Sequence, residues 1–125
     1  MSFGGIKISS ADRLFSLLVR SKARWRCERC GKKYEPPTMA LHCAHIFSRS
    51  HKATRFSLDN CKSWCYGCHS YMDRNPLEKY EWYKQKFGSE KFDMILKMSK
   101  VPKKVDEKLI AVWCRQELKK IGQTF

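Results

Sequence analysis

Four cysteines arranged as two Cys-x-x-Cys pairs constrain the fold of this 125-residue chain more than any other feature. The pairs are Cys27 with Cys30 and Cys65 with Cys68, and 34 residues lie between them. Two turns that each offer two thiols can surround one zinc ion with the closed, tetrahedral shell of a structural site. The alternative, a redox-active Cys-x-x-Cys, needs a thioredoxin-like βαβ pattern that this sequence lacks. We therefore expect a structural zinc that joins the chain after a first helix to the start of a central one.

Cysteine number and hydropathy indicate the compartment. The chain has seven cysteines, an odd number, and residues 1–7 contain no apolar signal core. Both observations favour metal binding in a reducing compartment over a set of disulfides. No segment approaches the roughly 20 apolar residues of a membrane span. We expect a soluble, cytoplasmic protein without membrane contact.

The charge balance indicates the kind of partner. The chain carries 26 Lys and Arg against 12 Asp and Glu, a formal net charge of +14. Such an excess favours a polyanionic partner, and nucleic acid is the commonest one. Membrane surfaces and acidic proteins remain open on charge alone.

The sequence predicts one α+β domain in three parts, because 125 residues suit a single core. Residues 1–26 form an N-terminal helical extension, in which Ser9 to Arg26 predicts an amphipathic helix. Its basic face is either solvated or in contact with phosphate. Residues 27–75 form the zinc-braced core, and residues 76–125 form C-terminal helices. Proline, glycine and cap-type residues predict three such helices, at about 76–88, 89–101 and 106–121.

Inside the core, the pattern predicts a hairpin followed by a helix. Ala40 to Ile46 and Cys61 to Trp64 indicate two short strands that pair with each other, and the polar segment 47–57 indicates a loop between them. A helix is expected from Cys65 to about Arg74. A lone hairpin is marginal in water, so the zinc is expected to supply stability that this small core lacks.

A second group of chemically capable residues lies within the zinc-braced core. His45 ends the first expected strand, Asn60 precedes the second, and His69 directly follows the last zinc cysteine. Asp73 lies four residues beyond His69, so the two share a helix face and can bind one ion. Imidazole and carboxylate in a partly open site suit Mg, Mn or Zn. A neutral imidazole could then take a proton from water that attacks a phosphate, while the ion stabilises the leaving oxygen.

These residues resemble the HNH nuclease family. The resemblance rests on Cys-x-x-Cys, then Ala44-His45-Ile46, then Leu58-Asp59-Asn60, then Cys65-x-x-Cys68-His69. Within the family, the stretch from His45 to Cys68 is most similar to the phage NinG/Rap-type recombination nucleases. The resemblance implies a ββα-metal (His-Me finger) nuclease core over residues 27–75, DNA as the substrate, and a phage or prophage gene.

The resemblance also implies a role for each matching residue. The general base falls on His45. Asn60 falls on the middle Asn, which in most members fixes the loop and so orients the base, and in some binds the metal. His69 falls on a metal ligand, and Asp73 on a position that often supplies another.

The sequence departs from the family at the first metal ligand. Many members place Asp, Glu or His directly before the base, and this chain has Ala44 there. His42 is the expected substitute, because NinG-like sequences carry an Asp at that offset. A regular strand would put His42 and His45 on opposite faces, so the substitution requires the strand to bend or end between them. Cys43 is a weaker candidate, since thiolate is a poor ligand for Mg.

Three cations and three cysteines remain. Arg49, Lys52 and Arg55 lie in the loop between the strands, where they either contact DNA phosphates or are solvated cations. The remaining cysteines are expected to be small buried thiols; they are Cys43, Cys61 and Cys114.

Two functions follow as hypotheses. The first is a metal-dependent endonuclease that nicks or cuts duplex or branched DNA, with a second copy of the chain or phage packaging or recombination proteins as further partners. The alternative is a non-catalytic, zinc-stabilised nucleic-acid-binding module or regulator. Replacement of His45 by alanine separates them, because a base acts only in the transition state and contributes little to binding.

Overall fold

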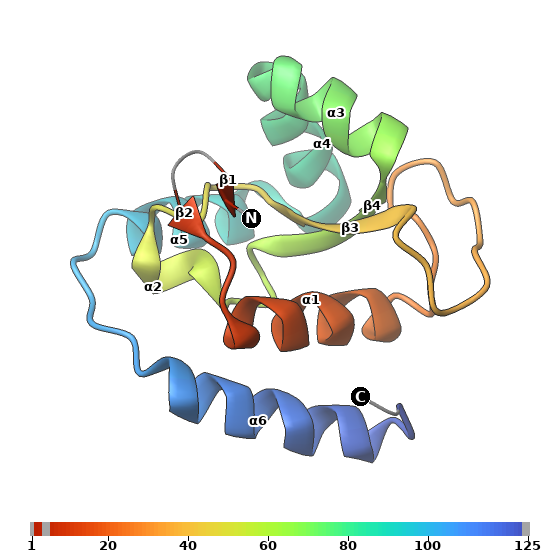
Figure 1. Cartoon of the computed structure of the whole chain (residues 1–125). Coiled ribbons are helices and arrows are strands. Elements are labelled where there is room, and N and C mark those ends of the chain that lie inside the picture. The colour runs from red at the N-terminus through yellow and green to blue at the C-terminus, as the bar shows by residue number, and fades with distance from the viewer. Residues whose placement is uncertain (1, 4–5, 124–125) are drawn as a thin grey trace.

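The computed structural model describes residues 2–3 and 6–123 of the chain (Figure 1). This part of the chain is α+β. Its strands are β1 (Ser2–Phe3), β2 (Ile6–Lys7), β3 (Leu41–His45) and β4 (Cys61–Cys65). Its helices are α1 (Ser10–Lys22), α2 (Lys52–Arg55), α3 (Tyr66–Arg74), α4 (Pro76–Phe87), α5 (Ser89–Ser99) and α6 (Glu107–Lys120).

The centre of the molecule is the antiparallel hairpin of β3 and β4. Leu41 pairs with Cys65 at one end of the ladder, and His45 pairs with Cys61 at the other. The register is continuous over all five pairs. Because side chains alternate along a strand, each strand contributes residues to both faces of this two-stranded sheet.

Helices cover both faces of the hairpin. In Figure 1, α1 lies along one face with α6 beyond it, and α3 and α4 lie on the other side of the hairpin. The α1 face belongs to a core that includes Phe15, Leu18 and Leu118. The opposite core is centred on Trp64 and Tyr83, both fully buried. The sheet therefore lies between two apolar clusters and contributes side chains to both.

Local sequence explains where α1 begins and ends. Ser9 caps the helix: its hydroxyl accepts from the Asp12 amide, and the Asp12 carboxylate accepts from the Ser9 amide. The chain leaves the helix after Lys22, because Arg24 and Trp25 adopt positive φ angles of 56° and 58°. Trp25 is buried in the turn, which delivers the chain to the first cysteine pair.

The α+β class and the order of the main elements confirm the sequence prediction. The first helix is shorter than the expected 9–26, and the loop expected at 47–57 contains the one-turn helix α2. The two-residue strands β1 and β2 were not predicted, because strands this short have no periodicity. Within the described residues, the helices are too short or too polar to span a bilayer.

Candidate functional site

Cys27, Cys30, Cys65 and Cys68 come together as the spacing predicts. Their sulfur atoms all lie within 4.8 Å of one another, and the Sγ atoms of Cys30 and Cys65 are 4.0 Å apart. In each pair the amide of the second cysteine points at the sulfur of the first, at 3.5 Å. Thiolate ligands commonly receive such N–H groups, and four converging thiols fit a tetrahedral ion. The group could hold a structural zinc.

The electrostatics of this group favour a thiolate at Cys27. Burial opposes ionisation, but amide groups of Cys30, Cys65 and Arg29 outweigh it and lower the pKa of Cys27 to about 7. Burial raises the pKa of Cys68 to about 12, although the Arg29 guanidinium donates to its sulfur at 3.4 Å. Cys65 caps α3, so the positive end of that helix faces the group.

His42, His69 and Asp73 meet where β3 faces α3. The Nδ1 atoms of His42 and His69 are 2.9 Å apart, so one ring donates to the other. Asp73 Oδ2 lies 3.2 Å from Nε2 of His69, the nitrogen on the far side of that ring. The same carboxyl also pairs with Lys79, at 3.3 Å. Burial and the neighbouring His69 lower the pKa of His42, which keeps its imidazole neutral.

This geometry suits two imidazole ligands better than three converging groups. Adjacent positions on an octahedral ion with bonds of about 2.1 Å are roughly 3.0 Å apart, close to the separation of the two Nδ1 atoms. Asp73 contacts the opposite nitrogen of His69, and in that position it orients the ring rather than reaching the same point. Among the described residues, the ligand atoms of these three side chains do not all lie within 4.8 Å of one another.

His45 lies on the other face of the hairpin from His42. The ladder runs unbroken from Leu41 to His45, so the bend or strand end that would bring His42 and His45 to one face is absent. The Nε2–H group of His45 donates to the Arg55 carbonyl at 2.9 Å. Burial lowers the pKa of His45, and so does the positive charge of Arg49. The bond to the Arg55 carbonyl raises it by less, so the pKa falls to about 4.

Asn60 fixes the loop that joins the two strands. The residue is fully buried. Its amide nitrogen donates to the carbonyls of Phe47 and Thr54 at 2.9 and 3.1 Å, and its oxygen accepts from the Phe47 amide at 2.9 Å. Nothing in these bonds points Asn60 toward a metal, so its contacts agree with the loop-fixing alternative.

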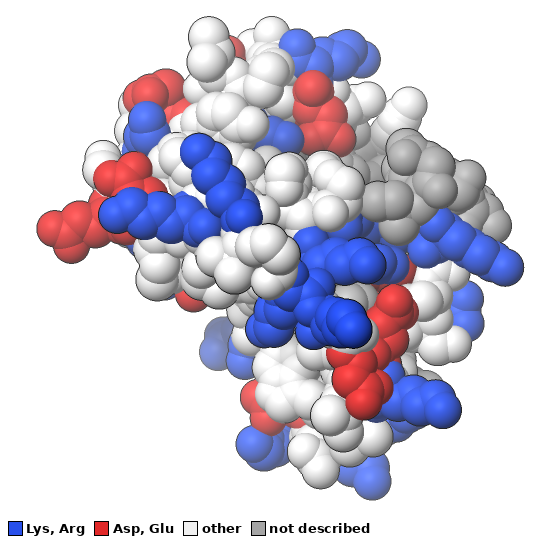
Figure 2. Space-filling view, turned by 90° about the vertical axis from the view of Figure 1, so that its left-hand side faces the viewer, with Lys and Arg blue, Asp and Glu red and all other residues white. Residues whose placement is uncertain are grey.

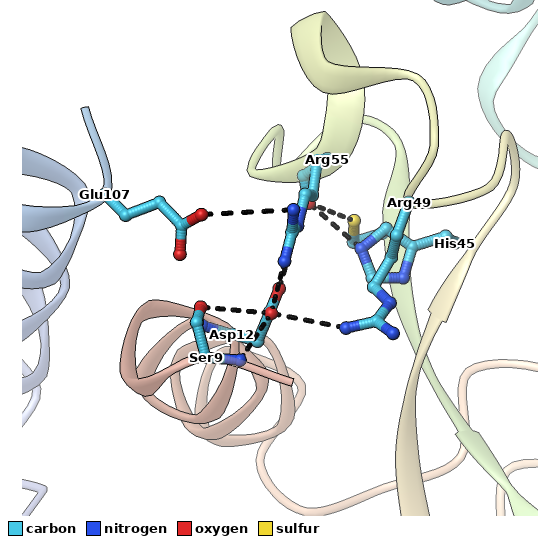
Figure 3. A network of polar contacts seen from close by, with 7 residues as sticks. Ser9, Asp12, His45, Arg49, Arg55 and Glu107 are labelled. Carbon is cyan, nitrogen blue, oxygen red and sulfur yellow. Dashed lines mark hydrogen bonds and ion pairs between the residues drawn. The ribbon is translucent and has the colours of Figure 1, made fainter. Parts of the chain in front are cut away.

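Two of the three loop cations expected at phosphates are turned inward (Figure 3). The Arg55 guanidinium makes a two-pronged contact with Asp12, at 2.5 and 3.1 Å, and lies 4.0 Å from Glu107. Arg49 reaches the same Asp12 carboxylate at 3.2 Å. Arg55 is buried, and it links α1, α2 and α6.

Asp12 is the residue that sequence reasoning missed. Its position three residues after Ser9 identifies a helix cap and nothing more. Its partners Arg49 and Arg55 lie 37 and 43 residues away, so no local pattern could reveal the network. Although burial raises the pKa of Asp12, its bonds with Arg55 and Ser9 leave that pKa below its usual value.

Lys52 is the loop cation that faces outward. It lines an open surface pocket of about 350 Å³ between α2 and the segment after α5, together with Lys100 and Lys103. Figure 2 shows Lys and Arg side chains gathered near the middle of this face.

Fold and site together define a small α+β protein with a four-cysteine group able to hold zinc. No family model matches the chain, and no curated protein or solved structure matches it either. The site itself is therefore the basis for its function.

Proposed function

We propose that this chain is a metal-dependent DNA endonuclease of the HNH, ββα-metal type. The observation that carries the proposal is the hairpin-and-helix unit formed by β3, β4 and α3, with His45 at the end of the first strand and a buried Asn60 fixing the connecting loop. The four-cysteine group would hold a structural zinc beside this unit.

His45 has the protonation state that a general base requires. Its Nε2 proton is committed to the Arg55 carbonyl, so the lone pair of the neutral ring lies on Nδ1. With a pKa of about 4, the ring is neutral at pH 7. Nδ1 would take the proton of a water molecule as its oxygen bonds to phosphorus, and the bond to the leaving oxygen breaks.

The contacts around His45 hold its ring in one orientation. Asn60 fixes the loop at Phe47 and Thr54, and Asp12 fixes the Arg55 side chain whose backbone carbonyl receives the imidazole. Such pre-orientation lowers the cost of reaching a reactive geometry.

His42 and His69 would hold the divalent ion, with Asp73 orienting His69. Two imidazole donors favour Mn or Zn over Mg, whose preferred ligands are oxygen atoms. A bound divalent ion would stabilise the charge that develops on the leaving oxygen.

One observation favours a second candidate function. His45 and the His42–His69 pair lie on opposite faces of the hairpin, so a phosphate would have to reach both around the open edge of β3. Arg49 and Arg55 already pair with Asp12. The same fold with this arrangement would serve as a non-catalytic, zinc-stabilised DNA-binding module.

The deciding experiment is cleavage of supercoiled plasmid by the purified protein in Mg, Mn or Zn, with EDTA as the blank. His45→Ala is compared with His51→Ala, a matched replacement of an exposed histidine. We expect nicking or linearisation that needs added ion, survives in His51→Ala, and falls at least 100-fold in His45→Ala. DNA binding should be retained by both variants.

A branched DNA substrate is run in parallel, because the resemblance includes recombination nucleases. Cleavage of neither substrate, together with a retained gel shift, would establish the binding module and reject the nuclease.

A further inference from the structure

The α1-facing side of the hairpin carries a cluster that includes His45 and two thiols that the proposed function does not use. Cys43, His45 and Cys61 each offer one ligand atom, and these atoms all lie within 4.8 Å of one another. His45 and Cys61 are directly opposite in the ladder, and Cys43 lies two residues before His45 on the same face. The continuous ladder therefore places all three side chains on the same face of the hairpin.

We propose that Cys43, His45 and Cys61 form a second metal site, separate from the four-cysteine group and selective for a thiophilic ion such as Zn²⁺ or Cu⁺. Two sulfurs and one imidazole nitrogen are a ligand set that these ions bind and that Mg²⁺ does not.

The distances require only a small contraction. Tetrahedral zinc with Zn–S bonds of about 2.3 Å separates two sulfurs by roughly 3.8 Å. The same upper bound of 4.8 Å holds for the ligand atoms of the four-cysteine group. Rotation of the Cys43 side chain, which is partly exposed, can close the remaining gap.

Ser63 supplies a second, independent observation. It is paired with Cys43 in the ladder and so faces the same side. Its side chain is fully buried, and its hydroxyl has no hydrogen-bond partner among the described residues. Buried polar groups without partners are uncommon, and each needs an explanation. A hydroxyl that donates to a metal-bound thiolate would satisfy it.

The charge of the filled site also fits its surroundings. Two thiolates and a neutral imidazole give Zn²⁺ a net charge of zero, which is the least costly charge state to bury. Asn60 Nδ2 lies 3.9 Å from the sulfur of Cys61, where it can donate to a bound thiolate. Binding releases the two thiol protons to solvent, and His45 keeps the single proton that it donates to the Arg55 carbonyl.

If the chain is the proposed nuclease, the site has a consequence for catalysis. An ion that takes the lone pair of His45 leaves no base for the attacking water. Filling of the Cys43–His45–Cys61 site and phosphodiester cleavage would then exclude each other.

Cobalt reconstitution tests the site without reference to activity. Thiolate-to-cobalt charge-transfer absorption counts bound sulfurs, and the His42–His69 pair adds none. We expect the full-length protein to bind cobalt through six sulfurs, and Cys43→Ser to lose about one third of the absorbance as two of the six are released. The control is Cys114→Ser, a buried thiol outside the cluster, which should leave the absorbance unchanged.

A second measurement uses the wild-type chain, so that a variant that fails to fold cannot obscure the answer. Zinc is added in steps and free thiols are alkylated and mapped. Protection of Cys43 by the second equivalent supports the site. A spectrum that saturates at four sulfurs, or protection confined to the four-cysteine group, overturns it. Plasmid cleavage measured in the same titration then tests the consequence separately, and an inactive protein that still protects Cys43 leaves the site standing.

Discussion

A single backbone carbonyl, that of Arg55, determines the chemistry available to His45. Because a carbonyl can only accept, it fixes the proton of the imidazole on Nε2. Burial then lowers the pKa to about 4, well below the usual 6.5. The ring is thus neutral over most of the accessible pH range, and this has two measurable effects.

The first effect is on the rate of the proposed reaction. A base with a pKa of about 4 is already deprotonated above pH 5, so the acid limb of kcat/KM should lie near pH 4 rather than near 6.5. Plasmid nicking between pH 4 and pH 8 at fixed free metal measures it. A limb at pH 6.5 would show that His45 is not the titrating base.

The second effect is on stability. The pKa of His45 is depressed in the folded protein, so the unfolded chain binds the proton more readily, and stability falls as the pH drops from 6.5 toward 4. Between pH 7 and pH 5 the loss due to this residue is about 2 kcal/mol. His45→Gln retains a donor for the Arg55 carbonyl and should lack this part of the loss. Urea unfolding of both proteins at the two pH values measures the difference, and equal losses would contradict the assignment.

Asp73 gives a third residue-level prediction. Its carboxylate orients His69 through Nε2, so Asp73→Asn should weaken Mn²⁺ binding about 10-fold or more without abolishing it, whereas His69→Ala should abolish it. Titration calorimetry measures both. Asp93→Asn, an exposed acid on α5, is the matched control, and equal effects of the two Asp variants would rule out this role.

At the scale of elements, α1 and α6 run side by side with their first turns together, as Figure 1 shows. Parallel helices place two positive dipole ends next to each other. Asp12 and Glu107 lie in those first turns and offset the repulsion, and both face the guanidinium of Arg55. The network of Figure 3 therefore joins two helices to the loop that holds His45.

Removal of Asp12 should be costly for this reason. In Asp12→Ala, the buried Arg55 guanidinium loses its two-pronged partner, and an unpaired buried charge costs about 3–5 kcal/mol. Glu107→Ala removes a half-exposed carboxylate at 4.0 Å and should cost about 1 kcal/mol or less. Denaturant unfolding compares the two. Similar losses in both variants would show that Asp12 acts as a helix cap alone.

Sequence patterns predicted the elements well and the site in part. Caps, prolines and apolar spacing identify α1 and α3–α6, and the Cys-x-x-Cys spacing identifies the four-cysteine group, because these signals are local. His42 and His45 lie on opposite faces because they are three residues apart on a regular strand. Only a bend in the strand would have placed them on the same face. The Asp12 network joins distant segments and leaves no pattern to detect.

At the scale of the whole molecule, a net charge of +14 favours a polyanionic partner, and the cations that line a pocket are candidates for contact with it. Lys52, Lys100 and Lys103 line the pocket beside α2, and Figure 2 shows this face. If DNA lies there, each lysine displaces counterions from a phosphate.

The salt dependence of DNA binding tests that face. A triple variant with Lys52, Lys100 and Lys103 changed to Gln should reduce the slope of log K against log salt by about 0.9 per lysine. The control removes the same charge at the far end of α1 and α6, from Lys22, Lys119 and Lys120. Fluorescence anisotropy at several salt concentrations gives the slope for each triple variant. Equal slopes for the two variants would show that DNA binds to another surface.

The four-cysteine group also affects the chain when it is unfolded. An ion held by both cysteine pairs closes a ring of 34 intervening residues that contains the whole hairpin and its loop. A closed ring of that length has fewer denatured conformations, and by the measure used for disulfides this stabilises the native state by about 4 kcal/mol. The loaded chain should therefore expose less surface in urea than the metal-free one, and its m-value should be smaller.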